Sequence, residues 1–163
     1  MLDARAPGNG SSRPAVDVDP ETLAVARRIR ERACAKVGLV PLHGGLEVMP
    51  TARRLARAFE ILGDQVDILD TLAPPATAER AGVARLDDRP AALERALEDS
   101  AARFARVLVA FAAPAGTGPA ASLLFALDGV VLIARSGGAT EFRLHKWLRR
   151  IDPERHLGVL LIE

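Results

Sequence analysis

Residues 123–163 read LLFALDGVVLIARSGGATEFRLHKWLRRIDPERHLGVLLIE, and this stretch decides the fold class. Asp128-Gly129 predicts a turn, and the short run from Val130 to Ala134, rich in β-branched residues, predicts a strand. Leu157 to Ile162 is a second apolar run without alternation, which is typical of a strand covered on both faces. The stretch therefore contains two predicted strands of the buried, parallel kind.

A helix is predicted between these two strands. Ser136-Gly137-Gly138 interrupts the first apolar run, and Thr140 with Glu141 opens a helix. Asp152-Pro153 ends it, because the residue before a proline is pushed out of the α region. The apolar positions of this helix fall roughly on one face: Phe142, Trp147, Leu148 and Ile151. Two strands joined by a helix form a right-handed parallel crossover, so we predict an α/β fold.

The rest of the chain repeats the alternation of helices and strands. Asp19-Pro20-Glu21 is a strong helix start, with a capping carboxylate and a proline in the first turn. The expected helices are 19–35, 50–62, 90–104 and a short one at 120–126, and the expected strands are 37–42, 65–69 and 106–112. We predict a three-layer α/β/α sandwich around a mostly parallel sheet of about five strands, like that of P-loop NTPases.

The pattern predicts a single domain over residues 19–163. Residues 1–18 are rich in Gly, Pro, Ser, Asp and Arg without periodicity, so we expect a disordered tail. A short motif that docks a partner is the alternative for this segment. Residues 71–89 have a weak pattern and are expected to form a long connection.

Composition limits the function classes. The formal net charge of +1 over 163 residues predicts no strong field, so neither nucleic acid nor an anionic membrane is indicated as a partner. The lone Cys34, expected within the first helix as a small buried or half-buried side chain, fits a reducing compartment. No apolar run has the length of a membrane helix or of a signal-peptide core, so we expect a cytoplasmic protein.

Ligands of such sheets bind beyond the carboxyl ends of the strands, and the loop from His43 to Thr51 lies at one such end. A phosphate-binding loop would carry GxxxxGK followed by Ser or Thr at this place. This loop has Gly44 and Gly45 but no lysine, Glu47 would repel phosphate, and a proline removes one helix amide. The sequence predicts a poor nucleotide site here, with only a weak functional role for His43.

Asp70 follows the second predicted strand directly. A carboxylate there can hold metal-bound water or orient a nucleophile, but a helix cap or a loop acceptor is the simpler interpretation. The third strand would end in an aspartate if it carried a Walker B motif, and Ala110, Phe111 and Ala112 occupy those positions. No histidine pair has metal-ligand spacing, so no metal or cofactor is expected.

The final predicted helix carries a row of cations: Arg143, Lys146, Arg149 and Arg150, with Arg135 just before it. Such a row is usually a solvated face. The alternative is a docking face for an acidic partner.

Two segments resemble a known family. Residues 126–137, ALDGVVLIARSG, are similar to the "ADGVLLVVRAG" strand of the cytoplasmic kinase domains of bacterial tyrosine kinases for capsule and exopolysaccharide synthesis, which belong to the deviant-Walker ATPases. Residues 63–70, GDQVDILD, resemble the "GKRVLLID" segment of that family. By that match Asp70 takes the place of the first aspartate of a second Walker motif, DxDxR. Leu72 and Pro74 stand where its second aspartate and arginine belong.

This resemblance implies a degenerate member of the family. The P-loop lysine, the second acid of the DxDxR motif and the Walker B aspartate of the family are all missing. The chain also has no tyrosine for an autophosphorylated cluster, so we predict that it is not an enzyme. The expected role is to regulate or scaffold an exopolysaccharide or cellulose synthesis and export machine through protein contacts, as a homo-oligomer or recruited to the inner membrane by a partner. The first alternative is a nucleotide-binding switch or ATPase that uses Gly44, Gly45, Thr51 and Asp70. The second alternative is a remote α/β protein without a link to polysaccharide.

Overall fold

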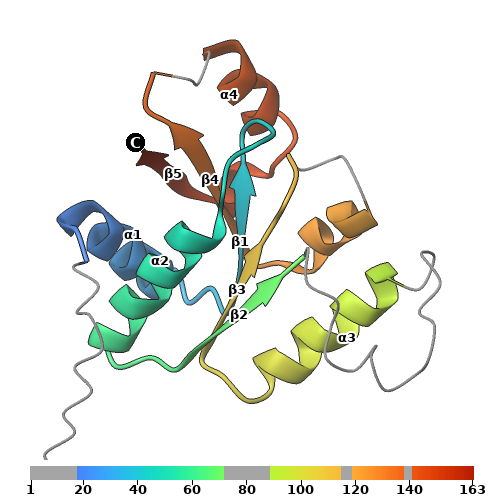
Figure 1. Cartoon of the computed structure of the whole chain (residues 1–163). Coiled ribbons are helices and arrows are strands. Elements are labelled where there is room, and N and C mark those ends of the chain that lie inside the picture. The colour runs from blue at the N-terminus through green and yellow to red at the C-terminus, as the bar shows by residue number, and fades with distance from the viewer. Residues whose placement is uncertain (1–17, 72–88, 115–118, 138–140) are drawn as a thin grey trace, which may run out of the picture.

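The computed structural model describes residues 18–71, 89–114, 119–137 and 141–163 (Figure 1). The predicted tail, apart from Val18, lies outside these residues. Most of the predicted connection, including Leu72 and Pro74, also lies outside the described residues. Thr140, at the expected start of the last helix, lies outside them as well.

The core of the described fold is one parallel sheet of five strands. These are β1 (Lys36–Pro41), β2 (Val66–Asp70), β3 (Arg106–Ala110), β4 (Gly129–Arg135) and β5 (His156–Ile162). Their order across the sheet is β2-β3-β1-β4-β5, and every neighbouring pair is parallel. All carboxyl ends therefore meet at one edge, and the predicted α/β class with about five strands is confirmed.

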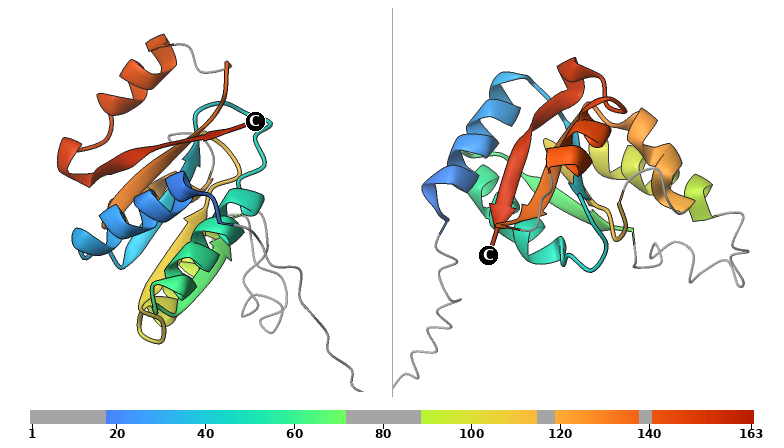
Figure 2. Two further views of the ribbon diagram at one scale, coloured as in Figure 1. Left: turned by 90° about the vertical axis from the view of Figure 1, so that its left-hand side faces the viewer. Right: turned by 90° about the horizontal axis from the view of Figure 1, so that it is seen from above.

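Helices cover both faces of this sheet (Figure 2). The first face carries α1 (Pro20–Glu31) and α2 (Met49–Ile61), which pack against each other. The second face carries α3 (Arg89–Ala101), the 3₁₀ helix η2 (Pro119–Ala126) and α4 (Glu141–Leu148). The short 3₁₀ helix η3 (Pro153–Arg155) leads into β5. The predicted three layers are present.

Two apolar cores explain why β4 shows no alternation. Val131 and Ile133 point into the core under α1 and α2, whereas Val130, Leu132 and Ala134 point into the core under α3, η2 and α4. Successive strand residues face opposite sides, so a strand between two helical layers must be apolar throughout. All five side chains are at most 1% exposed.

Helix α1 begins as predicted and ends earlier. Asp19 is its N-cap: the Thr22 amide donates to the carboxylate at 2.8 Å, and the Thr22 hydroxyl donates to it at 2.7 Å. The helix ends at Glu31 rather than Ala35, because Ala33 adopts a left-handed φ of 54°. Cys34 is buried as expected, but it lies in the turn after the helix.

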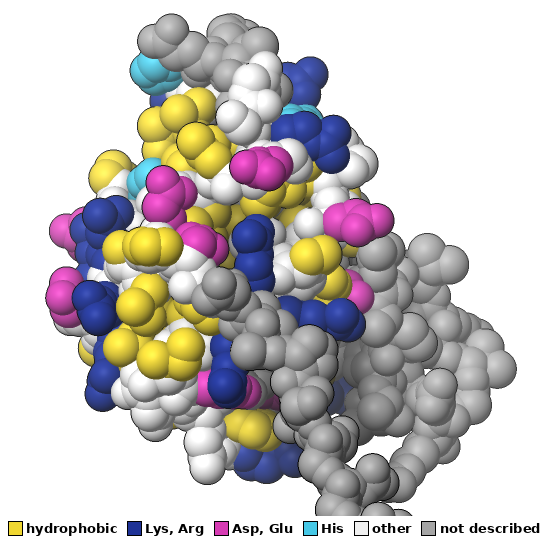
Figure 3. Space-filling view, turned by 60° about the vertical axis from the view of Figure 1, so that its left-hand side comes forward, with side chains coloured by type: hydrophobic (Ala, Val, Ile, Leu, Met, Phe, Trp, Pro, Cys, Tyr) yellow, Lys and Arg dark blue, Asp and Glu magenta, His cyan; other side chains and the backbone are white. Residues whose placement is uncertain are grey.

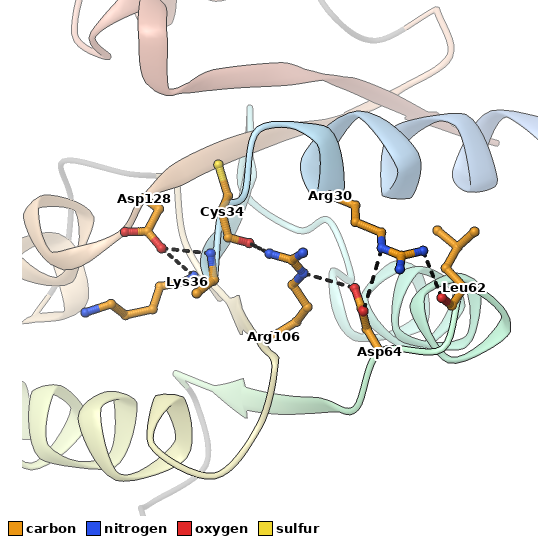
Figure 4. Close-up of polar contacts among 8 residues, drawn as sticks. Arg30, Cys34, Lys36, Leu62, Asp64, Arg106 and Asp128 are labelled. Carbon is orange, nitrogen blue, oxygen red and sulfur yellow. Dashed lines mark hydrogen bonds and ion pairs between the residues drawn. The ribbon is translucent and has the colours of Figure 1, made fainter.

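A polar network joins the elements at the amino-terminal edge of the sheet (Figure 4). Arg106 of β3 pairs with Asp64 at 3.2 Å and also donates to the Cys34 carbonyl. Arg30 of α1 lies 3.8 Å from the same carboxylate. Asp128, just before β4, accepts from the Ala35 and Lys36 amides, at 2.9 and 2.8 Å. These contacts hold the start of β1 between β3 and β4.

Candidate functional site at the carboxyl edge of the sheet

The loop between β1 and α2 lies at the carboxyl edge and is shaped by buried apolar anchors. Leu42, Leu46 and Val48 are at most 5% exposed, while Gly44 and Gly45 between them face solvent. Gly45 adopts a φ of 80°, a conformation that favours glycine. Buried apolar anchors flank the two glycines on both sides, so the loop forms a fixed turn in front of α2.

An open cleft of about 840 Å³ lies beside this loop. Gly45, Glu47, Pro50 and Thr51 line it from the loop and the start of α2. The other walls come from the start of α1, from Arg54 and from the carboxyl ends of β4 and β5: Asp19, Pro20, Glu21, Thr22, Arg54, Arg135, Leu160, Leu161, Ile162 and Glu163. Of the predicted site residues, the cleft thus contains Gly45 and Thr51.

The start of α2 has features of an anion site and one feature against it. Val48, its N-cap, makes no side-chain hydrogen bond to the amides of the first turn. The Thr51 side chain is 2% exposed and lines the cleft. Pro50, within the first turn, contributes no amide. Fewer backbone donors are therefore available here than in a phosphate loop.

The charges of the cleft are mixed. Arg54 and Arg135 are its two cations, set against four acidic residues: Asp19, Glu21, Glu47 and Glu163. The amide of Thr22, which donates to Asp19, holds the pKa of that carboxyl below its usual range, and Arg54 at 3.8 Å acts in the same direction. Figure 3 shows acidic and basic side chains interspersed over the visible face. A bare phosphate would meet more negative than positive charge in this cleft.

His43 belongs to the same loop but is not part of the cleft lining. Its Nδ1 lies 3.3 Å from the carbonyl of Gly44, the acceptor that assigns the proton to Nδ1. Its Nε2 is buried and has no hydrogen-bond partner among the described residues.

Asp70 is not brought to the cleft. It ends β2, and β3 lies between β2 and β1, so two strand spacings of about 4.8 Å each separate Asp70 from the β1 strand. Its register partner is Ala110, the last residue of β3. The predicted set of Gly44, Gly45, Thr51 and Asp70 is therefore spread along the edge rather than gathered around one point.

Thr71 is a structural residue of this edge that the sequence does not reveal. Its amide donates to the Ala110 carbonyl at 3.1 Å, and its hydroxyl accepts from the Ala112 amide at 3.0 Å. The side chain is 7% exposed. The threonine therefore fixes the first residues after β3. A Walker B motif would place its aspartate at this end of the strand.

The predicted docking residues occupy a different part of the molecule. Arg143, Lys146, Arg149 and Arg150 are exposed on α4 and the turn after it, on the face of the sheet opposite α1 and α2. They do not join the cleft.

No family model and no curated protein matches the sequence. Solved structures do match, and the matches show that the arrangement of sheet and helices is a fold that tyrosine kinase domains also have. The VpsO kinase domain aligns with a TM-score of 0.59 and 15% identity over 86% of this chain and 95% of that domain. The BceF tyrosine kinase domain gives 0.61 and 14% over 86% and 73%, respectively. The kinase domain of the Escherichia coli tyrosine kinase ETK gives 0.65 and 14% over 98% and 82%.

These matches correct one prediction. The prediction that the chain is not an enzyme is wrong, because its fold is one that tyrosine kinase domains use. The prediction relied on residue types missing from short linear motifs. Arg54 and Arg135, which are outside the Walker motifs considered above, line the cleft together with Thr51.

Within the described ranges, no three His, Cys, Asp or Glu side chains lie close enough together to hold a metal ion. Over the same residues, no helix has both the length and the apolar character needed to cross a bilayer.

Proposed function

We propose that this chain is a regulatory or scaffolding subunit of a bacterial exopolysaccharide synthesis and export system, and that it acts through protein contacts. The kinase-domain fold carries the proposal. The resemblance of residues 126–137 and 63–70 to the exopolysaccharide kinases also supports the proposal. These two segments contain β4 and β2, respectively. On this proposal the protein acts in the cytoplasm and reaches the inner membrane through its partner.

The charge of the edge cleft supports a role in contacts. Four carboxylates and two arginines line an open cleft, a surface that suits a protein partner better than a bare anion. The loop beside it is held by buried anchors, so its shape is preformed. Preformed surfaces lose little conformational entropy on binding.

Deletion of the gene in its source bacterium tests this function. We expect secreted polysaccharide to fall at least severalfold and to recover when the full chain is returned. Neighbouring genes for polysaccharide polymerisation or export would agree with this result. Unchanged polysaccharide output in the deletion strain would refute the proposal.

A second candidate is a nucleotide-binding switch with an unusual phosphate loop. The favouring observation is the group of Thr51, Arg54 and Arg135 beside an uncapped helix start. Arginines can hold phosphate oxygens through paired hydrogen bonds where a lysine is missing. Mg²⁺ would offset the surplus of carboxylates.

Calorimetry with ATP and ADP, with and without Mg²⁺, tests this candidate. We expect Mg²⁺-dependent binding that Arg54→Ala weakens by about tenfold, the typical effect of one charge-assisted hydrogen bond. Asp70→Ala tests the separate role of that carboxylate at the far end of the edge. Absence of binding at millimolar nucleotide would eliminate this candidate and leave the first one standing.

A further inference from the structure

An apolar groove lies on the second face, away from the carboxyl-edge cleft. It has a volume of about 290 Å³ and lies between η2, the end of α4, the start of β4 and η3. Its lining comprises Ser122, Leu124, Phe125, Val130, Trp147, Arg150, Ile151, Asp152 and Arg155. Because Val130 lies at the amino end of β4 and Arg155 directly precedes β5, the groove sits near the opposite edge of the sheet from the loop of β1.

The rim of this groove exposes an unusual side chain. Phe125 is 86% exposed, more than any other large apolar residue in the described part of the chain. Trp147 forms the groove wall and is 7% exposed. An exposed aromatic ring beside an apolar recess is the arrangement of a protein contact, in which the ring becomes buried on association.

A basic hollow continues from the groove. His145, Lys146, Arg149 and Arg150 line it, and Arg150 belongs to both. No ion pair among the described residues neutralises Arg143, Lys146, Arg149 or Arg150. These side chains, like Phe125, are exposed.

The other charges of this region are already engaged. Arg155 donates to the Leu124 and Leu127 carbonyls, which fixes η2 against η3. Asp152 caps η3 by accepting from the Glu154 amide at 3.0 Å. The local surplus is therefore positive and belongs to the end of α4.

The size of the groove restricts its occupant. Pockets for small molecules and cofactors usually measure about 300–1,000 Å³ and are concave on most sides. A recess at or below the lower limit fits one or two apolar side chains of a peptide better than a whole cofactor. The adjoining cations then select the peptide by charge.

We propose that this surface binds an acidic segment of a partner protein, whose aromatic or leucine side chain enters the groove while its carboxylates pair with Lys146, Arg149 and Arg150. This inference rests on the proposed function, since it names the contact surface of that role. In this proposal, Phe125 and Trp147 contact the apolar side chain of the partner segment. The cations of α4 orient the segment by pairing with its carboxylates.

The chain carries its own reporter for the test. Trp147 is the single tryptophan of the sequence and there is no tyrosine, so the intrinsic emission comes from the groove wall. The probe is a synthetic amphipathic peptide with leucine and phenylalanine on one helical face, glutamate elsewhere and no tryptophan. A lysine version and a scrambled version are its controls.

Two groove variants and two matched controls complete the design. Phe125→Ser removes the exposed ring, and the double variant Arg149→Glu with Arg150→Glu reverses the charge. Ile61→Ser is the apolar control, because Ile61 is 58% exposed on the other face, and Arg27→Glu on α1 is the charge control. All these side chains are exposed, so the variants are expected to fold.

We expect the glutamate peptide to change Trp147 emission saturably. Phe125→Ser should weaken the apparent affinity by about tenfold or more, since one buried aromatic anchor contributes at least that factor. The charge reversal should weaken it by about as much, because it replaces attraction to the glutamates by repulsion. The controls should match the wild type. No saturable change, equal binding of the lysine peptide, or wild-type affinity in the groove variants would overturn the proposal.

Anionic phosphatidylglycerol vesicles are the competing probe. A change of Trp147 emission with vesicles but none with the peptide would overturn the peptide proposal in favour of a lipid surface. In cells, the groove variants distinguish the proposed regulatory function from the proposed docking surface. If the deletion loses polysaccharide and the groove variants restore it fully, the regulatory function stands and the docking surface is refuted.

Discussion

Asp64 connects three elements through one carboxylate. It pairs with Arg106 of β3 and Arg30 of α1, and the Arg106 and Asp64 side chains are only 11% and 14% exposed. Removing the carboxylate leaves a largely buried guanidinium with the Cys34 carbonyl as an acceptor but without its ionic partner. We expect Asp64→Ala to lower the free energy of unfolding by about 2 kcal/mol in urea titrations.

Arg57 and Glu60 provide the matched exposed pair. They lie 2.9 Å apart on α2, and their side chains are 52% and 51% exposed. Solvent screens such pairs, so Arg57→Ala should change the free energy of unfolding by less than about 0.5 kcal/mol. Equal losses in the two variants would mean that burial does not decide the strength of these pairs.

Asp19 gives the first helix a pH-dependent cap. The Thr22 amide lowers the pKa of its carboxyl, so the folded state favours the ionised form. The resulting stabilisation is complete above the ordinary pKa of aspartate, about 3.9, and is lost as the pH falls through the lowered folded value. We expect the free energy of unfolding of Asp19→Asn to fall less than that of the wild type below about pH 4.

The asparagine variant is the informative one because its side chain still accepts the Thr22 amide but carries no titrating charge. Asp19→Ala should instead lose about 1 kcal/mol at neutral pH, the usual value of a helix cap. If wild type and Asp19→Asn lost stability in parallel on acidification, other carboxyls would control the transition.

Single positions also show the limit of sequence reasoning. Asp19 was predicted as a cap because its neighbours Pro20 and Glu21 form a local signature. Arg54 and Arg135 are 81 residues apart, and only the fold brings both to one cleft (135 − 54 = 81). Thr71 follows β2 in a stretch without periodicity, so no pattern indicates that its hydroxyl binds the Ala112 amide.

At the scale of elements, the close packing of β4 on β5 depends on Gly129. A Cβ at this position would lie 2.8 Å from Cγ of Leu157, which is 1% exposed and cannot move aside freely. We expect Gly129→Ala to lower the free energy of unfolding by about 2 kcal/mol, the typical result of overpacking a core.

Gly44→Ala is the matched control for this prediction. An added Cβ there meets no atom within 4 Å, and no positive φ is required. Its unfolding free energy should remain within about 0.5 kcal/mol of the wild type. A loss as large as that of Gly129→Ala would show that the glycine backbone, rather than packing against Leu157, limits stability.

The strands were predictable because apolar residues predominate in each of them, and β4 and β5 have their expected centres. The end of α1 was not predictable, because the turn after the helix uses Ala33 at positive φ. The usual sequence signal for such a helix end is a glycine or an asparagine. The order β2-β3-β1-β4-β5 also has no local signature. Strand order arises from packing of whole units, which a pattern along the chain does not encode.

At the scale of the whole molecule, the net charge of +1 conceals a separation of charge. The cleft at the carboxyl edge is lined by four carboxylates and two arginines, whereas Lys146, Arg149 and Arg150 are exposed together at the end of α4 on the other face. The composition therefore predicted the absence of a strong overall field without revealing either surface. Local charge, rather than the total, selects a partner at contact distance.

This separation makes salt a selective perturbation. Raising ionic strength from about 0.1 M to about 1 M shortens the Debye length from roughly 10 Å to roughly 3 Å, which weakens attraction between exposed charges. The folded core depends mainly on apolar burial on both faces of the sheet. We expect affinity for the glutamate peptide, measured by Trp147 emission, to fall by about tenfold, while the urea midpoint does not fall. A urea midpoint that fell together with peptide affinity would mean that salt unfolds the protein, and peptide affinity unchanged by salt would remove the α4 cations from the contact.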